Sequence, residues 1–95
     1  MHVIAKSTLE AFAEDHPDAL DELLEWHSTI ERNSPANFAE VKALYSDADR
    51  VGRFVVFNIC HNDYRLIVNF HHNRNKAYIH EVLTHKEYDR GLWKD

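Results

Sequence analysis

The chain has 95 residues, of which 16 are acidic and 11 are lysine or arginine, and its formal net charge is −5. This length allows one domain with one core and a shallow site, and it excludes a deep cofactor cavity. A single cysteine, Cys60, excludes an intrachain disulfide, and no apolar run reaches the ~20 residues of a membrane span. We therefore expect a soluble protein of the cytoplasm that makes no contact with a membrane.

The charge is divided unevenly along the chain. Residues 1–49 carry three Lys/Arg and eleven Asp/Glu, a balance of −8, whereas residues 50–95 carry eight and five, a balance of +3. The acidic half is typical of helices with a solvated face. The basic excess falls on the predicted strands, where an anionic ligand could be met.

The first half predicts helices. Residues 3–5 form a strand or an extended lead-in, and Ser7 and Glu10 have the spacing of a capping box for a first helix. A break at residues 15–18 precedes a second helix, because proline restricts the residue before it. That helix is predicted to have one buried stripe, made by Leu20, Leu23, Leu24, His27 and Ile30. Asn37 is then the predicted cap of a shorter helix, with Glu40 three residues further on.

The second half predicts strands over residues 54–60, 64–71 and 77–83, where the apolar pattern changes to period two. Residues 46–50 are expected to be a polar loop. The sequence therefore predicts a single α+β domain over residues 1–95, with two to three N-terminal helices packed on a small antiparallel sheet of three to four strands.

The register of the first hairpin follows from its apolar residues. With Asn62-Asp63 as a two-residue loop, the opposed pairs are Ile59 with Leu66, Phe57 with Val68, and Val55 with Phe70. This face packs on the helices. The other face then carries Asn58, Cys60, Arg65, Ile67, Asn69 and His71. The third strand has polar residues on both parities and cannot be oriented.

Four side chains late in the sequence suit metal-free RNA cleavage, which needs a base, an acid and a cation for the phosphorane charge. Arg65 can bind two phosphate oxygens, and His85 can act as base or acid near neutral pH. Lys86 can add positive charge, and Tyr88 can donate a proton or stack on a base. Structural alternatives stand beside these roles: a surface ion pair for Arg65, a cap for His85 and packing on the sheet edge for Tyr88.

Other chemistry is less well supported. His71, His72, His80 and His85 fall in the strand region, but their spacing does not match familiar zinc sites, so we expect no metal and no cofactor. Cys60 has no evident base beside it and is expected to be structural. The aromatic residues Trp26, Phe38 and Tyr45 are expected in the core, and Trp93 either anchors the tail or meets a partner.

Several motifs resemble the HigB toxins of bacterial type II toxin–antitoxin modules. They lie between Leu44 and Asn58 (Asp47-Ala48-Asp49, Val51-Gly52 and Val55-Val56-Phe57-Asn58), at Asn62-x-Tyr64-Arg65-Leu66-Ile67, at Thr84-His85-x-Glu87-Tyr88-Asp89 and at His16-Pro17-Asp18-Ala19. The resemblance implies the RelE-like toxin fold and cleavage of mRNA, usually on the translating ribosome. It also implies a HigA-like helix-turn-helix antitoxin, and contact with operator DNA only through that antitoxin.

The resemblance places Asn58, Tyr64, Arg65, His85, Tyr88 and Asp89 at matching motif positions. The catalytic candidates are Arg65, His85, Lys86 and Tyr88. The candidates for RNA binding are Arg53, Asn58, Asn62, Tyr64, Arg74 and Lys76.

The chain departs from the family at two places near this site. In the first hairpin turn relatives commonly have lysine and glycine, where this chain has Cys60, His61 and Asp63. Directly before the Thr-His pair relatives commonly have glycine, where this chain has Leu83. A weakened nuclease is therefore one hypothesis. The alternative is a non-catalytic binding module of the same fold, which acts through antitoxin and operator or on another target such as gyrase.

Overall fold

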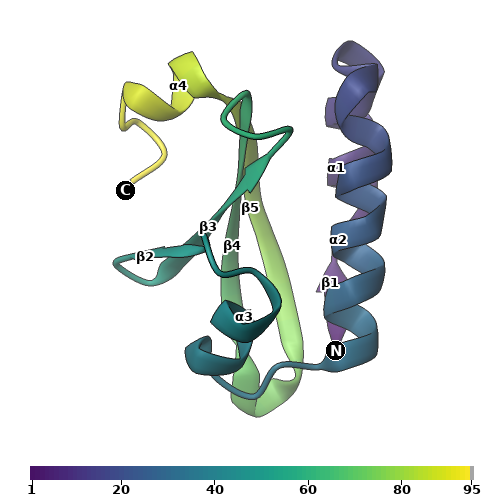
Figure 1. The fold of residues 1–95 in the computed structure, drawn as a ribbon, viewed down its shortest axis with the longest axis vertical. Helices are drawn as coiled ribbons and strands as arrows, with labels where there is room; N and C mark the ends of the chain where they lie inside the picture. Colours follow the sequence, from purple (N-terminus) through teal and green to yellow (C-terminus); the bar gives the residue numbers. More distant parts are fainter. Residues whose placement is uncertain (95) are drawn as a thin grey trace.

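The fold is a curved sheet with a helical layer on one face and a short C-terminal helix on the other (Figure 1). The computed structural model describes residues 1–94. The helices are α1 (Lys6–Asp15), α2 (Leu20–Asn33), α3 (Phe38–Leu44) and α4 (His85–Asp89), with short 3₁₀ turns at Pro17–Ala19 and His72–Arg74. The strands are β1 (His2–Ile4), β2 (Asp49–Val51), β3 (Phe54–Ile59), β4 (Tyr64–His71) and β5 (Lys76–Thr84).

The α+β class is confirmed, but the sheet is larger than predicted and is mixed. Its five strands have the order β1-β5-β4-β3-β2, and β1 pairs with β5 in parallel while the other pairs are antiparallel. β2 was expected to be loop. It is a three-residue edge strand whose Asp49 and Arg50 give no apolar alternation, and it is defined by its pairing with β3.

The predicted register of the β3–β4 hairpin is wrong by two residues. Phe57 pairs with Leu66 and Ile59 with Tyr64, so residues 60–63 form a four-residue turn. Cys60 and His61 both take positive φ, at 51° and 62°, which the two-residue loop did not allow for. Because a shift of two residues preserves parity, the apolar face predicted to meet the helices does so. Cys60 itself is turned toward the helices instead of the opposite face.

A bulge explains why β5 could not be oriented from its sequence. Ile67 pairs with Glu81 but Val68 pairs with Ile79, so one residue of β5 is passed over. The extra residue changes which side of the sheet each parity faces. Ile79 and Val82, which have opposite parity in the sequence, accordingly pack in the same apolar cluster.

The predicted N-cap of α3 is confirmed, whereas the predicted capping box of α1 is not. The Asn37 side chain accepts a hydrogen bond from the Glu40 backbone amide at 3.0 Å, which confirms the cap of α3. The predicted Ser7–Glu10 capping box is wrong. β1 ends at Ile4 and α1 already begins at Lys6, so its N-cap is Ala5, which makes no side-chain hydrogen bond.

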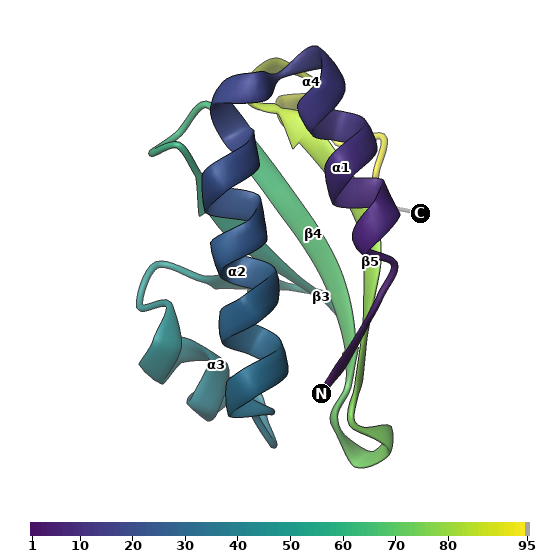
Figure 2. The same ribbon diagram turned by 90° about the vertical axis from the view of Figure 1, so that its right-hand side faces the viewer.

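Two apolar clusters lie on the two faces of the sheet. The larger one joins α1 and α2 to β3, β4 and β5, and Figure 2 shows both helices crossing this face. α2 contributes Leu23, Trp26 and Ile30, while Leu20 from the predicted stripe is 36% exposed. The smaller cluster, of Phe54, Val56, Ile67 and Trp93, covers the other face beside α4. Within residues 1–94, no helix combines the length and the apolar character needed to cross a membrane.

Candidate active site

Arg65 lies on β4 and projects from the sheet face opposite α1 and α2, as the strand parity predicted. The residue is only 9% exposed. Its Nη1 donates to the carbonyl oxygens of Asn62 at 2.9 Å and Tyr64 at 3.3 Å. The guanidinium carbon also lies 5.2 Å from the centre of the Tyr88 ring. The guanidinium is therefore held in place by the β3–β4 turn and by α4.

His85 is brought to Arg65 by the local structure at the start of α4. The Thr84 hydroxyl accepts from the Glu87 amide, and the Glu87 carboxylate accepts from the Thr84 amide, which forms a capping box. This begins α4 directly after β5, and the His85 amide donates to the Asp63 carbonyl at 2.9 Å. His85, the first residue after β5, therefore lies against the β3–β4 turn.

The contacts of His85 determine its tautomer. Arg65 Nη2 lies 3.1 Å from His85 Nδ1, and His85 Nε2 lies 3.2 Å from Asp89 Oδ2. A guanidinium can only donate, so Nδ1 must accept and the ring proton is on Nε2, facing Asp89. The His85 and Asp89 side chains are 52% and 60% exposed, so this pair is open to solvent.

Tyr88 closes the other side of Arg65. Its ring stacks on Trp93 at a centroid distance of 5.0 Å, and the Trp93 indole donates to the Tyr88 carbonyl at 3.0 Å. Burial raises the pKa of Tyr88, and the positive charge of Arg65 opposes that shift. Tyr88 is therefore a protonated phenol at neutral pH. Trp93 is 3% exposed and anchors the C-terminal tail, which was one of the two roles expected for it from the sequence.

A hollow of about 310 Å³ opens beside these residues. It is lined by Lys42, Asp47, Ala48, Asp49, Val56, Asn58, Asn62, Arg65 and Tyr88. Asn58 donates to Asp47 at 3.1 Å, and the Lys42 ammonium donates to the carbonyls of Ser46 and Ala48. Lys42 was not among the site residues predicted from the sequence, because it belongs to the acidic half of the chain and lies in no motif.

The structure gathers some of the predicted site residues and separates others. Arg65, His85, Tyr88, Asn58 and Asn62 lie together. Lys86 is exposed on α4 beside His85. The remaining candidates lie elsewhere in the fold.

The Tyr64 hydroxyl faces the helical layer, where it donates to Asp18 at 2.8 Å. Arg74 and Lys76 lie at the opposite end of β4, where His71 pairs with Lys76. That end is roughly 20 Å from Arg65, because Arg65 and His71 are six residues apart on β4 and each strand residue adds about 3.3 Å. Arg53 lies at the β2–β3 turn, 4.7 Å from the Phe54 ring centre.

Histidine does not gather into a metal site in the part of the chain that the structure describes. Residues 1–94 contain no group of three or more His, Cys, Asp or Glu that could hold a metal ion. His72 Nδ1 contacts the Pro35 carbonyl at 2.9 Å, and His80 Nε2 contacts the Trp93 carbonyl at 3.1 Å. These rings are used in packing and in hydrogen bonds of the fold.

Comparison with known proteins places this architecture in a family. Residues 19–91 match the HigB toxin family, described as the RelE-like toxic component of a toxin–antitoxin system. The chain is 33% identical over 92 residues to the mRNA interferase toxin HigB of Escherichia coli (strain K12), which covers 94% of this chain and 88% of that protein. The mRNA interferases HigB of Escherichia coli O157:H7 and Shigella flexneri give the same identity and coverage.

The protein is thus a small toxin with the RelE-like fold, in which helices cover one face of the sheet and α4 lies on the other. The chain belongs to the HigB toxin family, and this confirms the family suggested by the sequence motifs. The matched range, residues 19–91, includes Arg65, His85 and Tyr88. As the toxin of a toxin–antitoxin system, it has an antitoxin as partner.

Proposed function

We propose that this protein is a metal-free endoribonuclease that cleaves mRNA, with Arg65 and His85 at its active site. The observation that carries the proposal is the 3.1 Å contact between the guanidinium of Arg65 and the imidazole of His85 beside an open hollow. The HigB relatives named mRNA interferases support it.

In this reaction the ribose 2′-oxygen attacks the adjoining phosphorus, its proton passes to a base, and the 5′-oxygen leaves with a proton from an acid. The products are a 2′,3′-cyclic phosphate and a 5′-hydroxyl. The lone pair of His85 Nδ1 is the base that this site offers, but Arg65 occupies it in the free protein. A phosphate in the hollow draws the guanidinium away and frees that lone pair, because a charged acceptor binds arginine more strongly than a neutral ring nitrogen does.

The other two candidates complete the reaction. Tyr88, a phenol kept protonated by the raised pKa that burial gives it, donates to the leaving oxygen. Lys86, exposed on the same short helix, adds positive charge near the phosphate. Asn58 and Asn62 line the hollow and contact the nucleotide there.

Arg53, Tyr64, Arg74 and Lys76 lie outside the hollow and would meet more distant parts of the RNA or the ribosome. The net charge of −5 opposes tight binding of free RNA. We therefore propose that the translating ribosome presents the mRNA. We also propose that the antitoxin is a HigA-like helix-turn-helix protein, that operator DNA is met only through it, and that the protein acts in the cytoplasm.

The test is induction of the chain and of an Arg65→Ala/His85→Ala variant in bacteria, with 5′ ends of cellular mRNA mapped by primer extension. The chain is expected to arrest growth and to produce new 5′ ends, and the variant is expected to do neither. The matched control is His2→Ala/Arg32→Ala, which removes the same two residue types at exposed positions on β1 and α2. If the cuts persist in the Arg65/His85 variant, the site is wrongly assigned.

Purified protein then separates the role of the ribosome from that of the site. Cleavage of one mRNA, free and bound to ribosomes, is compared at equal concentrations. Faster cleavage on the ribosome by 10²-fold or so, a difference of about 3 kcal/mol in the barrier, is the expected result. Equal rates would remove the ribosome from the proposal but leave the nuclease.

Two observations favour a second candidate, the non-catalytic binding module. Asp47 and Asp49 border the hollow, where they repel phosphate, and Arg65 is held by two backbone carbonyls like a structural arginine. Under this hypothesis induction leaves growth and RNA intact while the protein still binds its antitoxin.

A further inference from the structure

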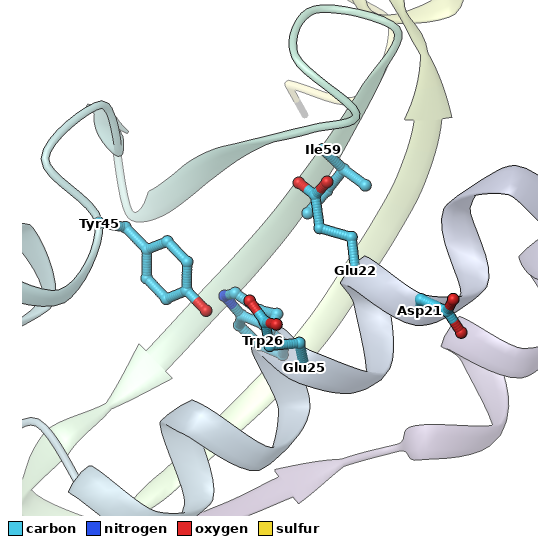
Figure 3. A pocket seen from close by; sticks show the side chains of 6 residues that line it. All are labelled: Asp21, Glu22, Glu25, Trp26, Tyr45 and Ile59. Carbon is cyan, nitrogen blue, oxygen red and sulfur yellow. The ribbon is translucent and has the colours of Figure 1, made fainter.

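A second pocket, of about 310 Å³, lies between α2 and the end of β3 on the helical side of the molecule. Figure 3 shows the side chains that line it: Asp21, Glu22, Glu25, Trp26, Tyr45 and Ile59. Three of these six carry a carboxylate and none carries a positive charge. Glu22 and Glu25 are three residues apart on α2 and therefore share one face of the helix.

Trp26 supplies a second and independent observation. The residue is 1% exposed, and its indole Nε1 is buried and has no hydrogen-bond partner. Among the side-chain nitrogen and oxygen atoms of residues 1–94, it is the buried atom that lacks one. In Figure 3 the nitrogen-bearing edge of the indole is turned toward Tyr45. A buried donor without an acceptor is costly, so this edge of the pocket requires an acceptor.

The remaining walls of the pocket are fixed. The Trp26 and Tyr45 rings each contact Phe57, at centroid distances of 5.3 and 5.4 Å. Glu22 accepts a hydrogen bond from the Cys60 amide at 3.0 Å, so its carboxylate is tied to the β3–β4 turn. The pKa of Tyr45 is raised, first by burial and then by Glu25 and Glu22, which agrees with a negative potential in the pocket.

These features together define the ligand chemistry. The carboxylates select a cation, and the indole N–H selects an acceptor atom close to that cation. A metal ion supplies no acceptor, and RNA is repelled by the carboxylates. A polypeptide segment supplies both, because an arginine side chain brings the cation and the adjoining backbone carbonyl brings the acceptor. The planar guanidinium can also bridge two carboxylates, which an ammonium does less well.

We propose that this pocket receives an arginine of the antitoxin, with the guanidinium between Glu22 and Glu25 and a neighbouring carbonyl accepting from Trp26 Nε1–H. The proposal relies on the chain being the toxin of a toxin–antitoxin system and does not depend on RNA cleavage. It assigns to the acidic face of α2 a role that the active site does not use.

The first test uses a defined probe, the peptide acetyl-Ala-Arg-Ala-amide, added to the ¹⁵N-labelled full chain. The reporter is the Trp26 indole N–H signal, which a Trp93→Phe variant distinguishes from that of Trp93. A saturable shift that weakens in 0.5 M salt is expected with this peptide and not with its citrulline counterpart, which has the same shape without the charge. Equal shifts with both peptides, or none, would overturn the proposal.

Matched variants locate the site. Glu25→Gln is expected to weaken peptide binding by about two- to fivefold, the size of one exposed ion pair. Glu14→Gln, an exposed carboxylate on α1 outside the pocket, is expected to leave it unchanged. Equal losses in both variants would mean that the peptide follows the net charge of the helices and has no site.

The complex with the antitoxin decides whether the arginine comes from that partner. Binding of the antitoxin is expected to shift the Trp26 indole signal, and Glu25→Gln is expected to lower the affinity of the complex while RNA cleavage by free Glu25→Gln is unchanged. A complex that forms equally well with Glu25→Gln and leaves the indole signal in place would refute the proposal. The indole signal and the affinity of the complex are both measured without an active nuclease, so failure of the proposed function remains distinguishable from failure of this proposal.

Discussion

His85 has both ring nitrogens engaged in the free protein, by Arg65 on one side and by Asp89 on the other. In the proposed reaction Nδ1 takes a proton from RNA and the ring becomes a cation, which the Asp89 carboxylate at Nε2 would stabilise. Under this proposal Asp89 is a positioning residue, which was recognised from the motif but not included in the predicted site. Its effect should appear in the rate.

Asp89→Asn is therefore expected to slow cleavage by about fivefold, because an exposed ion pair contributes about 1 kcal/mol. The measurement is single-turnover cleavage of ribosome-bound mRNA at pH 7. Asp15→Asn, at the exposed end of α1, is the control. An unchanged cleavage rate in Asp89→Asn would show that the carboxylate does not act on His85.

At the scale of single elements, α4 owes its position to its cap. The helix has five residues and carries His85 and Tyr88, so its own hydrogen bonds are few. Thr84→Ala removes the N-cap and is expected to cost about 1 kcal/mol of unfolding free energy. Fraying of α4 should then lower cleavage more than the loss of stability alone explains. Thr8→Ala, within α1, provides the comparison in urea unfolding.

The same cap makes stability depend on pH through Glu87. Hydrogen bonds from Thr84, first from its backbone amide, lower the pKa of Glu87. A lowered carboxyl pKa means that the stabilisation is present above the ordinary glutamate range and is lost as the pH falls through the lowered value. Glu87→Ala should therefore be less stable than the parent chain at pH 7, and the difference in urea midpoint should vanish in acid. A difference that is constant with pH would contradict this account of the cap.

Capping also shows where sequence patterns succeed and fail. Ser7 and Glu10 have the spacing of a capping box and do not form one, because β1 is held in the sheet up to Ile4 and α1 begins at Lys6. Thr84 and Glu87 have the same spacing and do form one. The pattern states which hydrogen bonds are available, while the strand before the helix determines whether they are made.

The sheet also shows which features the sequence pattern could predict and which it could not. The period of the apolar residues correctly assigned the face of Arg65, because a wrong parity would bury polar side chains. It could not give the length of the turn, since Cys60 and His61 take positive φ without being glycine or asparagine. The period also could not predict the contact between His85 and Arg65, because that contact depends on a bulge in β5 and on the cap of α4.

Across the whole molecule, the β3–β4 turn is the place where the two faces of the sheet are connected. From the helical side, Asp18 accepts from the Tyr64 hydroxyl and Glu22 accepts from the Cys60 amide. From the other side, Arg65 donates to the Asn62 carbonyl and also contacts His85. The helical layer thus helps to hold the turn that positions Arg65, the arginine of the proposed active site.

This connection should be measurable through Tyr64. The hydrogen bond to Asp18 is the largest cause that raises the pKa of Tyr64 from 10.0 to about 12. Because the folded state favours the protonated phenol, the stabilisation is complete below pH 10 and is lost as the pH rises through about 12. Tyr64→Phe should therefore have a lower urea midpoint than the parent chain at pH 8, and the two midpoints should converge in strong base. Tyr78→Phe, on β5, is the matched control. A Tyr64→Phe difference that persists unchanged to pH 12 would show that Asp18 does not hold the phenol, and that the helices and the turn are joined by other contacts.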